Sequence, residues 1–281
     1  MQVLVFGETG QVATALKRLA PGYAFLSRAE ADLTNPSACA NAILARAPDA
    51  VINAAAWTNV DAAEADEPAA TVVNADAPAA MARACAALGI PFVTISTDYV
   101  FDGSGDTPWA PDAPTAPLNA YGRSKLAGET AVRAAGGQAA ILRTSWVFSA
   151  DGTNFVKTML RLSESRDALS IVADQIGGPT PAAAIANAAI RIVQALHGGH
   201  PGGTWHIAGH PFVSWADFAR RIFDLAGRSV TVTPIPSADY PTPAPRPLNS
   251  RLDCASLLSD FGLAQPDWMA ALRADVKRLT Q

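Results

Sequence analysis

The sequence predicts an α/β fold in which a doubly wound parallel sheet is followed by a smaller α/β unit. Short apolar runs and helical patterns alternate at least five times within about the first 145 residues, which is typical of βαβ units and parallel strands. The first apolar run ends in a glycine turn, as in Rossmann-like nucleotide-binding sheets. No fixed-period repeat is visible, so solenoids and propellers are excluded.

Length and composition limit the possible functions. The chain has 281 residues, 49% of them hydrophobic, which is enough for one large or two modest domains. The net charge of −4 and the scattered Lys and Arg residues give no basic patch, which argues against nucleic-acid binding. We expect residues 1–148 to form a dinucleotide-binding domain, with some later segments returning to it, and 149–281 mainly to form a substrate domain.

Residues 2–6 form the first predicted strand and lead into a turn that contains Gly7 and Gly10. Glycines allow the backbone to approach a pyrophosphate, which the amides at the start of the next helix stabilise. Gly7, Gly10, Gln11 and Val12 are therefore candidate cofactor-binding residues. A plain tight turn is the alternative for this motif taken alone.

The predicted second strand, 24–26, ends at Ser27 and Arg28. An acidic residue that would bind the ribose hydroxyls of NAD is missing there, and Arg28 would tolerate a 2′-phosphate. We expect NADPH, with some use of NADH; a solvated loop charge is the alternative for Arg28. Asp32 could accept a hydrogen bond from the adenine amine.

A third strand is predicted near 49–53 and is followed by alanines. Their small side chains leave room for a cofactor across the strand ends. We assign Trp57 and Thr58 to the rim of this cleft, with plain packing as the alternative for Trp57. An Ala-rich helical pattern over 68–88 stops at Gly89-Ile90-Pro91.

The fourth predicted strand, 92–95, runs into Ser96-Thr97-Asp98. Thr97 thus lies at a carboxyl end of the sheet, where ligands bind in open α/β folds, and its hydroxyl could hold a reacting carbonyl oxygen. A hydroxyl bonded to nearby backbone is the alternative. The Gly- and Pro-rich stretch 102–117 is predicted to be a loop.

Tyr121 and Lys125 follow on a predicted helix, where positions i and i+4 share one face. A nearby ammonium lowers the pKa of a phenol, so we expect Lys125 to lower the pKa of Tyr121 and make it a candidate acid. A chance match is the alternative for the spacing alone. A fifth strand is predicted over 139–143.

The C-terminal half offers fewer motifs. An amphipathic pattern covers 155–160, and the Gly-rich stretch 174–180 is predicted to be a closing loop. Alternating prolines at 241–247 indicate an extended arm. We expect Arg246, Asn249 and Arg251 to meet an anionic substrate there; a linker is the alternative.

Signals for metals, disulfides and targeting are weak. Three widely spaced cysteines in Ala-rich surroundings indicate small buried residues, namely Cys39, Cys85 and Cys254. The histidines lack a metal-ligand spacing, which argues against zinc. No signal peptide and no apolar run of roughly 20 residues is readable, so we expect a cytoplasmic protein.

The glycine turn, Asn53-Ala54-Ala55-Ala56, Ser96-Thr97-Asp98 and Tyr121-Gly122-Arg123-Ser124-Lys125 together resemble the extended short-chain dehydrogenase/reductase family. The resemblance narrows to its reductases of dTDP-linked 4-keto-6-deoxy sugars. The resemblance extends over nearly the whole chain, and the stretches that narrow it are 96–103, 143–147, 174–180 and 246–252.

This resemblance implies a reaction and site roles. Tyr121 would protonate the sugar O4 while the nicotinamide delivers hydride to C4 of dTDP-4-dehydro-L-rhamnose, giving dTDP-L-rhamnose. Lys125 would bind the nicotinamide ribose and Thr97 the carbonyl. The other implied contacts are Asp98 and Trp146 for the sugar nucleotide, Gly10, Gln11 and Val12 for the pyrophosphate, Asp32 and Leu33 for the adenine side, and Ala56, Trp57 and Thr58 for the inner cofactor wall.

The chain departs from that family's pattern in two places. Ala13 stands where glycine is common, which costs one methyl group at a helix contact. Some relatives form dimers bridged by Mg²⁺ through glutamates, but the first helix and 182–184 offer no carboxylate. We therefore expect no metal, and a monomer or weak homodimer. Alternatives are a reductase or epimerase for another 4-keto sugar nucleotide, or a non-catalytic NADP-binding regulatory subunit.

Overall fold

A six-stranded parallel sheet organises the computed structural model, which describes all of residues 1–281. Its strand order is β10-β5-β4-β3-β1-β2, and every neighbouring pair is parallel. The bounds are β1 Val3–Phe6, β2 Ala24–Leu26, β3 Ala50–Asn53, β4 Phe92–Thr97, β5 Ala139–Thr144 and β10 Gly203–Ile207. The predicted doubly wound α/β fold is confirmed.

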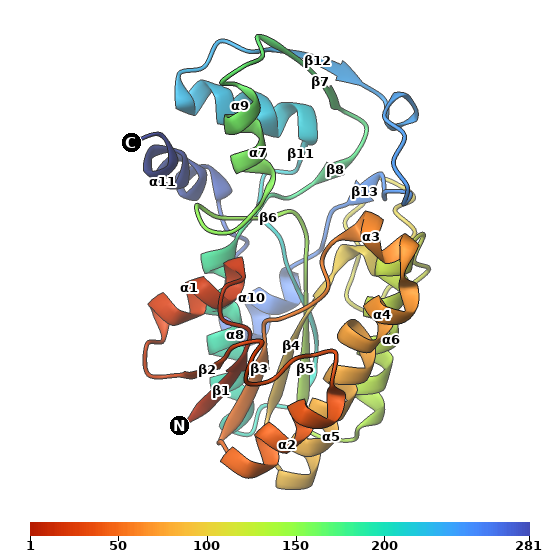
Figure 1. Ribbon diagram of the computed structural model, residues 1–281, viewed down its shortest axis with the longest axis vertical. Coiled ribbons are helices and arrows are strands. Elements are labelled where there is room, and N and C mark those ends of the chain that lie inside the picture. The colour runs from red at the N-terminus through yellow and green to blue at the C-terminus, as the bar shows by residue number, and fades with distance from the viewer.

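Helices cover both faces of this sheet (Figure 1). On one face, α1 (Gln11–Leu19) and α8 (Ala182–His197) pack on alternate strand residues such as Val3, Val5 and Ile52. On the other, α2 (Pro36–Arg46), α5 (Ala77–Leu88) and α6 (Ala120–Ala134) pack on Leu4, Phe6 and Val51. Strands buried on both faces need continuous apolar sequence, as β1 has.

The segment predicted as one helix over 68–88 is interrupted. After α3 (Val60–Ala65), it consists of α4 (Glu67–Thr71), a π-helical turn (Val72–Asp76) and α5. A π-helical turn inserts an extra residue and shifts the following face, and such turns often lie at functional sites. This turn contains Asn74, which belongs to the candidate site.

Local sequence signals define the helix ends. Side chains at the N-caps accept hydrogen bonds from the first turn in α2, α3, α4 and α6, through Asn35, Asn59, Asp66 and Asn119. Gly89 ends α5 in the left-handed conformation that glycine adopts at little cost. The start of α1 differs, because Gly10 offers no side-chain cap.

A smaller unit lies beyond the carboxyl ends of the main strands (Figure 1). It contains the sheet pairs β7–β12, β6–β9 and β11–β8–β13. Its core is formed by α7, α9 and α11, with Phe218, Phe223 and Trp268 buried among them. The bounds are β6 Val147–Phe148, α7 Phe155–Leu162, β7 Ala168–Val172, β8 Ile176–Gly177, β9 Thr180–Pro181, β11 Val213–Ser214, α9 Trp215–Ala226, β12 Thr231–Ile235, β13 Asn249–Ser250 and α11 Trp268–Thr280.

The chain crosses between the two units more than once. The helix α8, the strand β10 and the helix α10 (Ala255–Phe261) belong to the core of the main sheet, although they follow β6 in sequence. Short 3₁₀ turns cover Asp98–Val100 and Ser237–Asp239.

Two further predictions can be compared with the structure. All three cysteines are buried and free, as expected from their surroundings. No helix combines the length and the apolar character that crossing a bilayer requires.

Candidate active site

The predicted site residues gather where the main strands end. The turn after β1 brings its backbone close to the turn after β3, because a Cβ on Gly7 would lie 3.2 Å from the Ala55 Cβ. Gly7 has a φ of +102°, a conformation open to glycine. The first turn of α1 carries no cap and no acidic side chain, so its amides can bind an anion. Gly10, Gln11 and Val12 lie there.

Charged side chains of both signs follow the end of β2. Arg28 is exposed, and its Nε lies 3.1 Å from Oδ2 of Asp32. Glu30 is a carboxylate close to the strand end, and it accepts hydrogen bonds from the backbone and the hydroxyl of Ser27 at 3.0 and 2.9 Å. Leu33 is buried in the core beneath. An acidic residue is therefore present just after the strand end, at Glu30, whereas the expectation from the sequence concerned only 27–28.

Asn74, in the π-helical turn, is a site residue that no motif indicated. Its side-chain oxygen accepts from the Trp57 backbone N–H at 2.9 Å, and its amide donates to the Trp57 carbonyl at 3.0 Å. The same amide donates to the Ser124 hydroxyl of α6. Asn74 thus fixes the loop with Ala56 and Thr58, both exposed, against the helix that carries Tyr121. A lone polar residue in an Ala-rich run was its only signal.

Thr97, Asp98 and Tyr121 meet at the end of β4. The Thr97 hydroxyl donates to Asp98 Oδ1 at 3.1 Å and lies close to the Tyr121 phenol. The ring of Tyr99 packs edge-on against that of Tyr121, with centroids 5.5 Å apart. Asp98 is 2% exposed, and its Oδ2 has no hydrogen-bond partner.

The end of β5 adds a second buried oxygen without a partner. Thr144 pairs in register with Thr97, is buried, and its Oγ1 makes no hydrogen bond. Buried polar atoms are nearly always paired, so each exception needs an explanation. Two such oxygens on neighbouring strand ends are suited to a polar ligand. Thr144 was not among the predicted site residues.

The pKa of Tyr121 is shifted in the direction opposite to the one expected from the sequence. Burial raises the pKa of Tyr121 to about 12, and the charge of Asp98 acts in the same direction. The predicted lowering by Lys125 is therefore wrong for this arrangement. The Lys125 ammonium instead donates to the Ile95 carbonyl at 2.8 Å, and burial lowers its pKa to about 8. Burial also raises the pKa of Asp98 to about 7.

A buried ion pair lies one helical turn beyond Lys125. Glu129 receives Arg143 Nε at 2.8 Å and Nη2 at 2.6 Å, and Ser96 donates to it at 2.6 Å. Burial alone would favour the neutral acid, but Arg143 and Ser96 hold the pKa of Glu129 below its usual value. Arg143 also donates to the Pro111 carbonyl at 3.0 Å. This pair fixes α6 to the sheet and to the loop 102–117.

Trp146 lies just beyond β5 and is half-buried. It has a φ of +47°, which is unusual for a large side chain. Its indole stacks on that of Trp215, the first residue of α9, with centroids 3.5 Å apart. The predicted substrate-contacting residue is therefore held by the smaller unit.

The C-terminal arm is used differently from the expectation. Arg246 pairs with Asp61 of α3 at 2.9 Å and remains partly exposed. Asn249 is 1% exposed, and its amide donates to the Ser104 and Thr107 carbonyls, while its oxygen accepts from Arg251. Protein groups engage both the amide and the oxygen of Asn249 in this structure, and its substrate role stays a prediction. Arg251 is likewise turned to Asn249.

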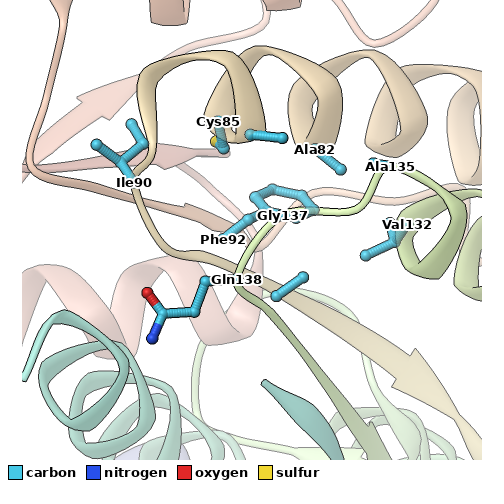
Figure 2. Close-up of a pocket in the computed structure, with 10 residues that line it drawn as sticks. Ala82, Cys85, Ile90, Phe92, Val132, Ala135, Gly137 and Gln138 are labelled. Atoms are coloured by element: carbon cyan, nitrogen blue, oxygen red, sulfur yellow. The ribbon is translucent and has the colours of Figure 1, made fainter. Parts of the chain in front are cut away.

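Two other kinds of site are not supported. A small apolar pocket with no room for a water molecule lies at the opposite end of β4, near Cys85, Phe92 and Gln138 (Figure 2). No charged side chain lines it, so it is a packing defect away from the strand ends. No group of three or more His, Cys, Asp or Glu side chains is placed to hold a metal ion.

Comparison with known proteins identifies similar chains over the full length. The family model described as RmlD substrate binding domain matches residues 1–281. A dTDP-4-dehydrorhamnose reductase of Sinorhizobium fredii is 44% identical over 283 residues, which cover 97% of this chain and 96% of the relative.

Solved structures agree with this likeness. A dTDP-4-dehydrorhamnose reductase from Clostridium acetobutylicum has a TM-score of 0.94 at 34% identity, with 100% of both chains covered. One from Bacillus anthracis, in complex with NADP, has a TM-score of 0.89 at 34% identity, with 99% of each chain covered.

Proposed function

The chain belongs to the dTDP-4-dehydrorhamnose reductase family, whose members are NAD(P)H-dependent oxidoreductases, and we propose that it reduces dTDP-4-dehydro-L-rhamnose to dTDP-L-rhamnose with NADPH. The observation that carries this proposal is that Thr97 and Tyr121 lie together at the carboxyl end of β4, with the Lys125 ammonium bonded to the Ile95 carbonyl of the same strand. Beside them, the unpartnered Asp98 and Thr144 oxygens offer hydrogen bonds to a polar substrate.

The cofactor fits the residues that are present. The uncapped start of α1 suits a pyrophosphate, and the close approach at Gly7 would be lost with any side chain there. Arg28 is exposed and suits a 2′-phosphate, whereas Glu30 opposes it. When bound, NADPH supplies the hydride that C4 receives.

The proton that O4 receives comes from a residue of the protein. The phenol of Tyr121 is neutral at pH 7, because burial holds its pKa near 12, so it carries the proton that O4 needs. The Thr97 hydroxyl lies close to that phenol and, on leaving Asp98, would donate to the keto oxygen and orient it. The Lys125 ammonium, which donates to the Ile95 carbonyl, would bind the nicotinamide ribose and so hold the hydride donor in place. One hydride and one proton convert the ketone to the alcohol.

A turnover assay tests this proposal. Reduction predicts one NADPH oxidised for each dTDP-4-dehydro-L-rhamnose consumed. An isomerised sugar with unchanged NADPH would point to an epimerase. Replacing Tyr121 by Phe removes the proton and keeps the ring, so turnover should fall by at least about 100-fold while NADPH binding is retained. A wild-type protein that binds NADPH but turns over no 4-keto sugar nucleotide would favour a regulatory subunit.

A further inference from the structure

The stacked tryptophans connect the two units beside the candidate site. Trp146 comes from the main sheet, two residues beyond β5, and Trp215 comes from the start of α9. Their ring planes differ by only 11° at a centroid distance of 3.5 Å. Because Thr144 pairs in register with Thr97, Trp146 follows the strand end that lies next to Thr97.

The backbone of Trp146 does not hold this position unaided. Its φ of +47° is sterically unfavourable for a residue with a Cβ. Such conformations persist only where the surrounding structure fixes them. One fixing contact is the hydrogen bond from the Thr180 N–H to the Trp146 carbonyl at 3.0 Å, which acts on the backbone alone.

Two contacts hold the indole itself. The face of the ring lies on Trp215. Elsewhere the ring approaches the backbone of Gly177 so closely that a Cβ there would lie 2.7 Å from Trp146 Cε2 and 2.9 Å from Nε1. A side chain at 177 would therefore move the indole. The ring has one position because both contacts are present.

Trp215 is in turn fixed by residues of the smaller unit. Its Nε1 donates to Gln175 Oε1 at 3.1 Å, and the Gln175 amide donates to the Ser237 hydroxyl at 2.9 Å. The ring of Phe155 packs against it with centroids 4.6 Å apart. These contacts leave Trp215 little freedom, so it can act as a rigid support.

We propose that Trp215 is a positioning residue, which acts through Trp146 to set one wall of the sugar-nucleotide site. The proposal rests on the proposed function for the identity of the ligand. A half-buried indole offers a flat apolar surface, which suits the apolar face of a 6-deoxy pyranose, while the polar strand ends receive its oxygens. Trp215 itself need not touch the sugar.

Steady-state kinetics with three variants test the positioning role. Trp215→Leu removes the supporting ring, so the KM for the sugar nucleotide should rise about tenfold, the scale of one aromatic contact. The kcat and the KM for NADPH should stay near wild type. Trp215→Phe keeps an aromatic support and should recover most of the loss. Trp205→Phe, in β10 beside α10, is the matched control and should leave all three constants unchanged.

Circular dichroism tests the stack independently of activity. Two stacked indoles couple and give a pair of far-ultraviolet bands of opposite sign. We expect these bands in wild type and in Trp205→Phe, and their loss in Trp146→Phe and in Trp215→Phe. Their persistence in Trp215→Phe would overturn the proposal. So would an unchanged sugar-nucleotide KM in Trp215→Leu, or an equal rise in the KM for NADPH. If the wild-type protein does not reduce the sugar nucleotide, the proposed function is wrong. The circular-dichroism bands would still show whether the two indoles stack.

Discussion

At the scale of single residues, burial decides the chemistry of the candidate site. It keeps Tyr121 protonated, with a pKa near 12, and brings Lys125 down to about 8. The sequence gives the i, i+4 spacing of these two residues but not how deeply they lie. It therefore predicts which groups meet and errs on the direction of the Tyr121 pKa. The same limit applies to Asn249, whose partners come from a loop over 140 positions away.

Cofactor preference is one consequence of the charges after β2. Arg28→Ala removes a cation that would face a 2′-phosphate, so the ratio of kcat/KM for NADPH over NADH should fall about tenfold. Glu30→Gln removes a carboxylate beside Ser27, and the ratio should rise. Both ratios are measured with the same sugar nucleotide. Equal ratios in both variants and wild type would show that the residues after β2 do not distinguish NADPH from NADH.

The pH profile should report Lys125. Burial lowers the pKa of Lys125 to about 8, so its ammonium is lost as the pH rises through 8. In the proposed reaction this ammonium would hold the nicotinamide ribose. We expect kcat/KM of the wild type to decline above that pH. Arginine stays charged, so Lys125→Arg should be slower but should lack the decline up to pH 10. The same inflection in Lys125→Arg would assign it to another group.

At the scale of elements, the apolar runs predict β1, β3, β4 and β5 because these strands are buried on both faces. The edge strand β2 is predicted too, although it is partly exposed. The apolar runs do not predict β10, whose sequence Gly-Thr-Trp-His-Ile begins with half-buried residues and whose partner β5 lies some 60 residues earlier. Nor does an Ala-rich helical pattern reveal the π-helical turn inside it. That turn places Asn74 against Trp57 and α6, a contact that only the folded chain defines.

The π-helical turn can be tested through Asn74. Asn74→Ala leaves the N–H and the carbonyl of Trp57 without their partners, so unfolding should become easier by about 1–3 kcal/mol. The loop at the cofactor wall would also lose its anchor, and the KM for NADPH should rise. Asn35→Ala is the control: it removes the N-cap of α2 and should cost about 1 kcal/mol without changing that KM. An unchanged KM in Asn74→Ala would limit the residue to a stabilising role.

At the scale of the whole molecule, ion pairs join segments that are distant in sequence. Asp61 and Arg246 connect α3 to the C-terminal arm. Asp151, in the loop after β6, receives Arg18 of α1 at 2.6 Å and Arg278 of α11 at 2.7 Å. Asp151 therefore ties the last helix of the smaller unit to the first helix of the main sheet. The sequence shows all three charges but cannot show that they meet.

The Asp151 junction makes stability depend on pH in a defined direction. Its hydrogen bond with Arg18 is the main cause that lowers its pKa from 3.8 to about 2. A carboxyl whose pKa is lower in the folded state stabilises the protein above its unfolded pKa. That stability is lost as the pH falls from about 4 to about 2. Because both arginine partners are about half exposed, solvent screening reduces the contribution of this shift to about 1 kcal/mol. In urea unfolding, Asp151→Asn should therefore be less stable than wild type at pH 7, and the difference should shrink towards pH 2.

Asp106→Asn, in the exposed loop 102–117, is the control and should show no such difference. A constant gap between Asp151→Asn and wild type at all pH values would mean that the junction acts through packing and not through its charge.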